Sequence, residues 1–151
     1  MKTYSIIWKL KDMNENCTFC KIINGFKKAH VVYQDDSTIA FFPRVMYTKG
    51  HLIIVPIDHY VDIFQVREDI LASMMEMIKF LSLHCKEVLG AEGINLLHAS
   101  GESAQQSIPH FHIHLLPRFN NDMLDAWPNM PAWDGDSEEL YNKLKVIDTP
   151  A

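Results

Sequence analysis

The chain has 151 residues, of which 48% are hydrophobic and 22% charged, and its formal net charge is −5. This length and composition are typical of one globular domain with a substantial core. The basic residues form no cluster and no apolar run approaches membrane-spanning length, so we expect neither a nucleic-acid groove nor a membrane segment.

The N-terminal residues 1–16 are interpreted as an arm that carries a short strand through Ile6, Trp8 and Leu10. Its apolar run is interrupted by lysines and is too short for a signal peptide. The chain has three cysteines, an odd number, which argues against a disulfide framework. A reducing cytoplasm is therefore the expected location.

Cys17-Thr18-Phe19-Cys20 begins a short predicted helix that runs to about Asn24 and ends at Gly25. A Cys-x-x-Cys pair in a cytosolic protein is either a redox pair or half of a zinc site. A redox pair is expected within a βαβ unit, whereas the next residues predict a hairpin with strands at 30–34 and 38–42. The zinc site is therefore the favoured interpretation.

The next predicted strand, Leu52 to Val55, is apolar throughout, which indicates burial on both faces, and it ends at Pro56. His51 stands at its start and His59 just beyond its end.

Between Arg67 and Gly90 the apolar residues recur at helical spacing, which predicts one long amphipathic helix. Its methionines are interpreted as core residues, and Cys85 as an inert buried thiol. The apolar face of this predicted helix comprises Ile70, Leu71, Met74, Met77, Ile78, Leu81, Cys85 and Val88.

A further strand is predicted at 93–98, and the polar loop 100–107 connects it to the run 110–118. In this run Phe111, Ile113 and Leu115 alternate with three histidines, which is the period of a half-buried strand. One face would carry the apolar residues into the core, and the other would present His110, His112 and His114 in a row. Imidazoles in such a row bind a metal, transfer protons or attack phosphorus. The polar loop before them is suited to wrapping a phosphate with its N–H groups and hydroxyls.

The run His-apolar-His-apolar-His followed by two apolar residues resembles the histidine triad (HIT) superfamily of nucleotide hydrolases and transferases, in its Hint-like, zinc-bearing branch. Gly50-His51 before a hydrophobic strand, His59 after Pro56, and Gln106-Ser107 in the loop agree with it. The resemblance implies an α+β fold: a mostly antiparallel sheet of about five strands with one long helix. It also implies that the sheet continues across a homodimer through the helix and the strand 93–98. The HIT domain would span 17–120, between the arm and a tail at 121–151.

The tail is expected to form a short helix from Ser137 to Val146. Its tryptophans either pack on the domain surface or, as the resemblance implies, approach the active site of the partner subunit. Trp127 and Trp133 are therefore candidates for substrate selection.

The resemblance also implies a structural zinc site. Two of its ligands would be the thiolates of the Cys-x-x-Cys pair. The other two would be the histidine that follows the 52–55 strand and the first histidine of the triad. Two sulfur and two nitrogen ligands make a closed tetrahedral site. The alternative for His59 is that it caps the following turn. The implied ligands are Cys17, Cys20, His59 and His110.

By the same resemblance His112 attacks the α-phosphorus of a nucleotide conjugate and becomes a transient nucleotidyl-histidine. Its other ring nitrogen would donate to a backbone carbonyl and so fix the tautomer. His114 and His51 would contact the phosphate oxygens, Gln106 would orient them, and Ser107 would reach the leaving atom. The alternatives are transfer of the nucleotidyl group to another acceptor, and a zinc-stabilised nucleotide-binding module with little turnover. Three histidines on a catalytic metal fit Ser107 and His51 less well.

Three positions depart from the family pattern. The acidic residue that binds the ribose hydroxyls falls on Pro43, which is followed by Arg44, a group that only donates hydrogen bonds. The loop asparagine falls on Ala99, and a loop glycine falls on Gln105. These departures leave the nucleophile intact and affect the sugar site. The further candidates for nucleotide binding are Phe19, Ile22 and Arg44.

Overall fold

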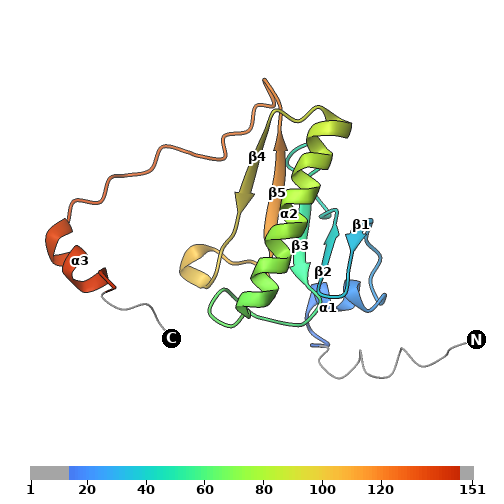
Figure 1. Cartoon of the computed structure of the whole chain (residues 1–151), viewed down its shortest axis with the longest axis horizontal. Helices are drawn as coiled ribbons and strands as arrows, with labels where there is room; N and C mark the ends of the chain where they lie inside the picture. The colour runs from blue at the N-terminus through green and yellow to red at the C-terminus, as the bar shows by residue number, and fades with distance from the viewer. Residues whose placement is uncertain (1–13, 147–151) are drawn as a thin grey trace, which may run out of the picture.

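The computed structural model describes residues 14–146, so the strand predicted in the N-terminal arm lies outside the described residues. A five-stranded antiparallel sheet in the order β1-β2-β3-β5-β4 forms the body of the protein (Figure 1). This confirms the predicted α+β fold. The strands are β1 (Val31–Gln34), β2 (Thr38–Phe41), β3 (Leu52–Pro56), β4 (Gly93–Leu97) and β5 (Ile113–Arg118).

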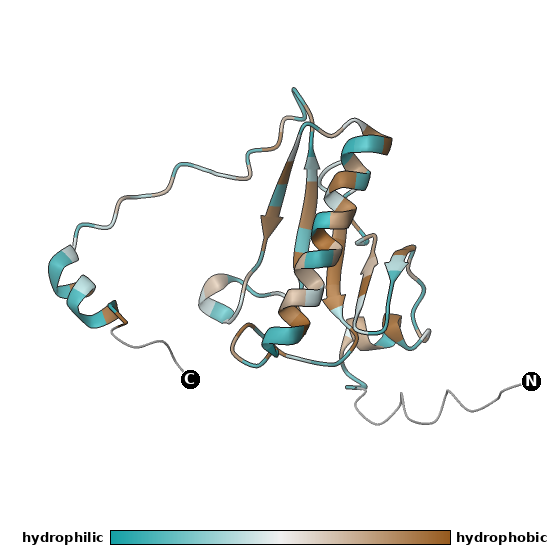
Figure 2. Ribbon diagram, viewed as in Figure 1, coloured by the Kyte–Doolittle hydropathy of each residue, from teal (hydrophilic) through white to brown (hydrophobic). Residues whose placement is uncertain are grey.

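The long helix α2 (Glu68–Leu89) lies across one face of this sheet, and hydrophobic and hydrophilic residues alternate along it (Figure 2). It ends where Gly90 takes a left-handed conformation with φ 71°, which glycine adopts at little cost. Met74, Ile78 and Leu81 pack with Phe111 and Leu115 of the triad segment in one core cluster. Val88, which was assigned to the apolar face, is 57% exposed, and Leu89 packs against the core instead.

The opposite face of the sheet is covered near β2 and β3 by the short helix α1 (Thr18–Ile23). The Sγ atom of Cys17 caps this helix by accepting a hydrogen bond from the Cys20 N–H. A second core cluster joins Phe19 of α1 to Phe41 and Ile53. Because both faces are covered, every residue of β2 and β3 is buried, as the continuous apolar run of β3 predicted.

The strand order brings distant histidines together. Antiparallel pairing of β3 with β5 places Ile53 opposite His114, so His51 reaches the same end of the sheet. Pairing of β4 with β5 places Leu97 opposite His114, which brings His98 alongside the segment before β5. β4 is an edge strand, the position that the expected dimer requires.

The triad segment is not a continuous strand, because β5 begins at Ile113 and not at His110. Its backbone groups find partners outside the ladder. The N–H of Phe111 donates to the Tyr60 carbonyl at 2.6 Å, and the carbonyls of His110 and His112 accept from imidazoles. The predicted division between faces is nevertheless present, since Phe111 and Leu115 are in the core and Ile113 packs against it.

The tail beyond residue 120 ends in α3 (Ser137–Leu144), which lies away from the sheet and is exposed along its whole length (Figure 1). Its N-cap is Asp136, whose carboxylate accepts from the N–H groups of Glu138 and Glu139. Trp127 and Trp133 are 80% and 64% exposed, so they do not pack on the domain surface. Within residues 14–146 no helix has the length and apolar character needed to span a membrane.

Candidate functional site

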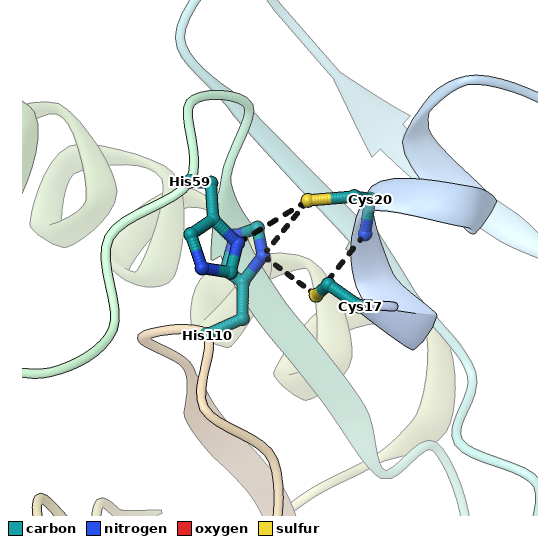
Figure 3. A group of neighbouring side chains, drawn as sticks. All are labelled: Cys17, Cys20, His59 and His110. Atoms are coloured by element: carbon teal, nitrogen blue, oxygen red, sulfur yellow. Dashed lines mark hydrogen bonds between the residues drawn. The ribbon is translucent and has the colours of Figure 1, made fainter. Parts of the chain in front are cut away.

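Four side chains that come from three separate segments converge beside the sheet: two from the start of α1, one from the loop after β3 and one from the segment before β5 (Figure 3). Their ligand atoms all lie within 4.8 Å of one another. The Sγ atom of Cys17 is 3.4 Å from Nδ1 of His110, and the Sγ atom of Cys20 is 3.3 Å from Nδ1 of His59. These are the four residues that the sequence predicted as zinc ligands.

The spacing and the donor set fit a tetrahedral metal ion. Zinc bonds of about 2.3 Å to sulfur and 2.0–2.1 Å to nitrogen give a sulfur–nitrogen edge of about 3.6 Å. The observed separations of 3.3 to 3.6 Å between the sulfurs of Cys17 and Cys20 and the ring nitrogens of His59 and His110 match that edge. Two thiols and two imidazoles are also the ligand types that zinc prefers.

The orientation of His110 supports the same conclusion. Its Nε2 lies 3.0 Å from the carbonyl oxygen of Pro56, and a carbonyl only accepts, so Nε2 carries the proton. Nδ1 therefore presents its lone pair to the cluster, as a metal ligand must. Burial lowers the pKa of His110 to about 4, which keeps the ring neutral, and burial raises the pKa of Cys20 to about 11. A bound dication reverses the second effect, since it favours the thiolate.

A second group of histidines lies on the same face. His51 is fully buried, and its Nδ1 accepts the backbone N–H of Tyr47 at 3.2 Å. Its Nε2 must then carry the proton, which it donates to Nδ1 of His114 at 2.9 Å. Nε2 of His114 is consequently an N–H donor. Burial is the main reason that the pKa values of both rings are lowered, that of His114 to about 4, so this chain of neutral tautomers persists at neutral pH.

His112 has the complementary orientation. Its Nδ1 donates to the backbone carbonyl of His110 at 2.6 Å, which leaves a lone pair on Nε2. Burial lowers the pKa of His112, and the ring is held edge-on by Phe19 at 5.2 Å between centroids. The rings of His112 and His114 are 5.1 Å apart. The site thus places a neutral ring nitrogen with a free lone pair next to an N–H donor, an arrangement suited to attack on an anionic phosphorus centre.

A fourth histidine, which the sequence analysis did not single out, holds this segment in place. Nδ1 of His98 is 2.7 Å from the carbonyl of His112, and its Nε2 is 2.7 Å from Oγ of Ser100. That oxygen accepts the N–H of Ile63 at 2.8 Å. The hydroxyl therefore donates to His98, and His98 donates to the nucleophile's backbone. The only sequence signal was a histidine at the end of the strand before the triad.

The loop before the triad is held by Gln106. Its side-chain amide donates to the carbonyls of Val61 and Ile108, and its oxygen accepts the N–H of Gly101. Its predicted contact with phosphate stays a prediction, as does the contact of the exposed Ser107 with the leaving atom. Gln105, which occupies a family glycine position, takes the left-handed conformation with φ 66°.

The other predicted nucleotide-binding residues line a cavity of about 630 Å³ between α1 and the ends of β1, β2 and β3. Phe19 and Ile22 form part of its apolar wall, and Pro43 and Arg44 lie on its other side. Phe19 joins this cavity to the histidines, because the same ring contacts His112.

The family model of the HIT domain matches residues 24–121. An uncharacterised HIT-like protein of Saccharolobus solfataricus is 33% identical, with 88% of this chain and 96% of that protein aligned. An adenylylsulfatase of Arabidopsis thaliana is 32% identical over 76% of this chain and 58% of its own length. An adenosine 5′-monophosphoramidase of Schizosaccharomyces pombe is 25% identical over 86% of this chain and 99% of its own length.

Solved structures share the fold. A protein of Streptococcus mutans superimposes with a TM-score of 0.78 at 27% identity, covering 89% of this chain and 84% of its own. A Zn-bound histidine triad family protein of Mycobacterium smegmatis superimposes with a TM-score of 0.70 at 30% identity, covering 82% of this chain and 86% of its own.

Proposed function

Because the chain belongs to the histidine triad (HIT) family, we propose that it cleaves nucleoside monophosphate conjugates at the α-phosphorus, with His112 as the nucleophile. One observation carries this proposal: hydrogen bonds to backbone groups fix the tautomers of His112 and His51, and the bond from the His51 ring fixes that of His114. They leave a lone pair on Nε2 of His112 and a proton on Nε2 of His114, and the two rings are 5.1 Å apart.

In the first step the Nε2 lone pair of His112 forms a bond to phosphorus while the bond from phosphorus to the leaving atom breaks. The leaving group departs with that electron pair and takes up a proton, for which the Ser107 hydroxyl is the proposed source. The ring becomes cationic, and the His110 carbonyl that accepts its Nδ1–H stabilises the charge. Nε2–H of His114 donates to a phosphoryl oxygen.

In the second step a water molecule attacks phosphorus, the phosphorus–nitrogen bond breaks, and Nε2 of His112 recovers its lone pair. The water loses one proton in this step, and that proton returns to the Ser107 oxygen. The products are a nucleoside monophosphate and the regenerated enzyme. Neutrality of His112 is essential for the first step, and its lowered pKa supplies it at physiological pH.

We propose that Cys17, Cys20, His59 and His110 hold a structural zinc ion. Four protein ligands close its coordination sphere, so it supplies stability rather than a site for substrate. The Pro56 carbonyl orients the His110 ring toward this ion, and the backbone carbonyl of His110 accepts a hydrogen bond from Nδ1 of His112.

The relatives support AMP as the nucleotidyl portion of the substrate, because two of them are named for cleaving AMP from sulfate or from an amine. We further propose a homodimer that pairs through the edge strand β4, and a cytoplasmic location. Sedimentation at micromolar concentration tests the dimer, since a monomer of 17.5 kDa would contradict it.

The test is hydrolysis of adenosine 5′-phosphoramidate and adenylyl sulfate, followed by release of AMP and by intact mass for a trapped nucleotidyl adduct. We expect turnover and an adduct that maps to His112. His112→Asn should reduce kcat by several orders of magnitude while AMP still binds.

His110→Asn is the matched variant, two residues away on the same face. It should lower the metal content and the melting temperature, whereas His112→Asn should leave both close to wild type. Turnover that survives in His112→Asn would contradict the mechanism. Binding of AMP without cleavage of any conjugate by the wild type would instead indicate the binding module.

A further inference from the structure

The cavity beside the histidines has an unusual charge. Its wall is apolar where α1 and β2 meet, but its outer edge carries the side chains of Lys27, Lys28 and Arg44, together with the imidazole of His30. Among the residues that the structure describes, no carboxylate lines it. The whole chain has 19 acidic residues against 14 lysines and arginines, so a cavity that gathers only cations runs against the composition.

These cations come from two segments that are held together. The N–H of Phe42 donates to the carbonyl of His30 at 3.0 Å, which joins the residues before β1 to the residues after β2. Lys27 and Lys28 approach the cavity from the first segment and Arg44 from the second. All three side chains are exposed at its mouth. The antiparallel hairpin thus brings the three cations to one end of the sheet.

The three cations are also uncompensated within the described part of the chain. The ion pairs among residues 14–146 engage Arg67, Arg118 and Lys143, each with a carboxylate nearby in the sequence. Lys27, Lys28 and Arg44 form no ion pair there. An anionic ligand would therefore meet cations that do not have to leave an internal partner first, which favours binding.

The cavity lies beside the proposed site of chemistry, and residues of its wall contact both. Phe19 lines the cavity and contacts the His112 ring, and Ile53, which also lines it, is paired with His114 across the sheet. A molecule whose phosphorus lies at His112 would thus extend its nucleoside over Phe19 toward the cations. The volume of about 630 Å³ is in the range of sites that enclose small ligands.

The chemistry of the mouth does not suit neutral sugar hydroxyls. A ribose is best held by an acceptor for its hydroxyl protons, whereas guanidinium and ammonium groups only donate, and Pro43 has no N–H. Cations that only donate are the partners of phosphate, and arginine matches its geometry with two parallel bonds.

We propose that the substrate of this site is a nucleotide conjugate that bears a second phosphate on the 2′ or 3′ oxygen of its ribose, bound by Lys27, Lys28 and Arg44. This inference rests on the proposed function only for the identity of the reacting phosphate. The binding preference itself requires no turnover.

The test is titration calorimetry of the full-length, metal-loaded protein with AMP, adenosine 2′,5′-bisphosphate, adenosine 3′,5′-bisphosphate and ADP. We expect one of the two sugar bisphosphates to bind at least tenfold more tightly than AMP, because each charge-assisted hydrogen bond is worth about that factor or more. ADP is the control for phosphate position, because its second phosphate is part of the 5′-diphosphate and not on the ribose. It should bind less than threefold more tightly than AMP.

Arg44→Gln should reduce the ratio of the AMP and bisphosphate dissociation constants at least fivefold, and Lys28→Gln should reduce it as well. Arg67→Gln is the matched control, because it removes the same charge at the N-cap of α2, outside the cavity. Dissociation constants for both sugar bisphosphates within threefold of AMP would overturn the proposal. So would a preference for ADP, or an equal effect of Arg67→Gln. Absence of turnover with tight bisphosphate binding would instead refute the proposed catalysis and leave this inference standing.

Discussion

Replacing Cys17 with serine tests the metal centre most directly. Cys17 is 4% exposed and its Sγ faces His110, so the variant loses a thiolate from a closed site without opening a path for water. A serine hydroxyl is a poor ligand for zinc, which prefers sulfur and nitrogen here. We expect the metal content to fall well below one ion per chain.

The expected loss of stability follows from the burial of the cluster. Cys17, Cys20 and His110 are each no more than 4% exposed, and removing one partner from a buried, charge-compensated group costs about 3–5 kcal/mol. Metal binding and folding are linked, so this loss appears in the unfolding free energy. For a chain of this size 1 kcal/mol corresponds to about 3–4 °C, and the melting temperature should fall by about 10–20 °C.

Cys85→Ser is the matched control. Cys85 is also buried, at 5% exposed, but it packs in the core under α2 and lies outside the metal cluster. Burying a hydroxyl there should cost about 1–2 kcal/mol with full metal content retained. The assay is thermal unfolding followed by circular dichroism, with metal analysis of protein purified without chelator or added metal. The reasoning is refuted if the wild type carries no metal, or if both variants lose the same stability.

Four further outcomes are expected. His98→Leu removes the donor to the carbonyl of His112 and should lower kcat about fivefold to tenfold with little change in KM, as steady-state kinetics would show. The pKa of His114 is lowered by burial to about 4 from an ordinary 6.5, so the unfolded state binds more protons between these values. Stability should be full above pH 6.5 and decline as the pH falls through this window, and urea unfolding of His114→Gln should show a shallower decline than that of the wild type. Gln105→Gly relieves a left-handed backbone conformation and should raise the unfolding free energy by about 0.5 kcal/mol in the same assay. Since Pro43 has no side-chain acceptor, kcat/KM for AMP and dAMP phosphoramidates should agree within about fivefold, and a fiftyfold penalty would reveal another acceptor for the ribose.

Much of the fold was predictable because its elements carry strong periodic signals. The apolar run of β3 and the helical spacing of α2 gave bounds within one or two residues of the structure. The cluster of Cys17, Cys20, His59 and His110 was predictable as a set only through the resemblance to the HIT family, because the Cys-x-x-Cys pair by itself left a redox pair open. Alternation at 110–115 predicted the correct faces, but it cannot distinguish a ladder strand from an extended segment whose hydrogen bonds go to imidazoles.

The features that escaped prediction depend on register and on segments far apart in the chain. The role of His98 depends on the register of β4 against β5. Because Leu97 is paired with His114, the following residue, His98, lies beside the segment that contains His112. Arg44 was predicted as a nucleotide-binding residue, but the presence of Lys27 and Lys28 at the same cavity depends on the hairpin and carries no local signal. Side-chain hydrogen bonds of Gln106 to backbone groups are likewise set by loop geometry alone.

The two halves of the site are joined through one residue, His110. Its Nδ1 faces the two thiols, its Nε2 donates to Pro56, and its carbonyl accepts the Nδ1–H of His112. The tautomer of His112 therefore depends on a backbone oxygen that belongs to a residue of the Cys/His cluster. Because β5 begins only at Ile113, the carbonyls of His110 and His112 bond to imidazoles and not to a neighbouring strand. His98 secures the other end of the same short segment by bonding the carbonyl of His112. The orientation of the proposed nucleophile, His112, is thus determined by the carbonyl of His110 on one side and by the ring of His98 on the other. Neither group needs to touch the substrate.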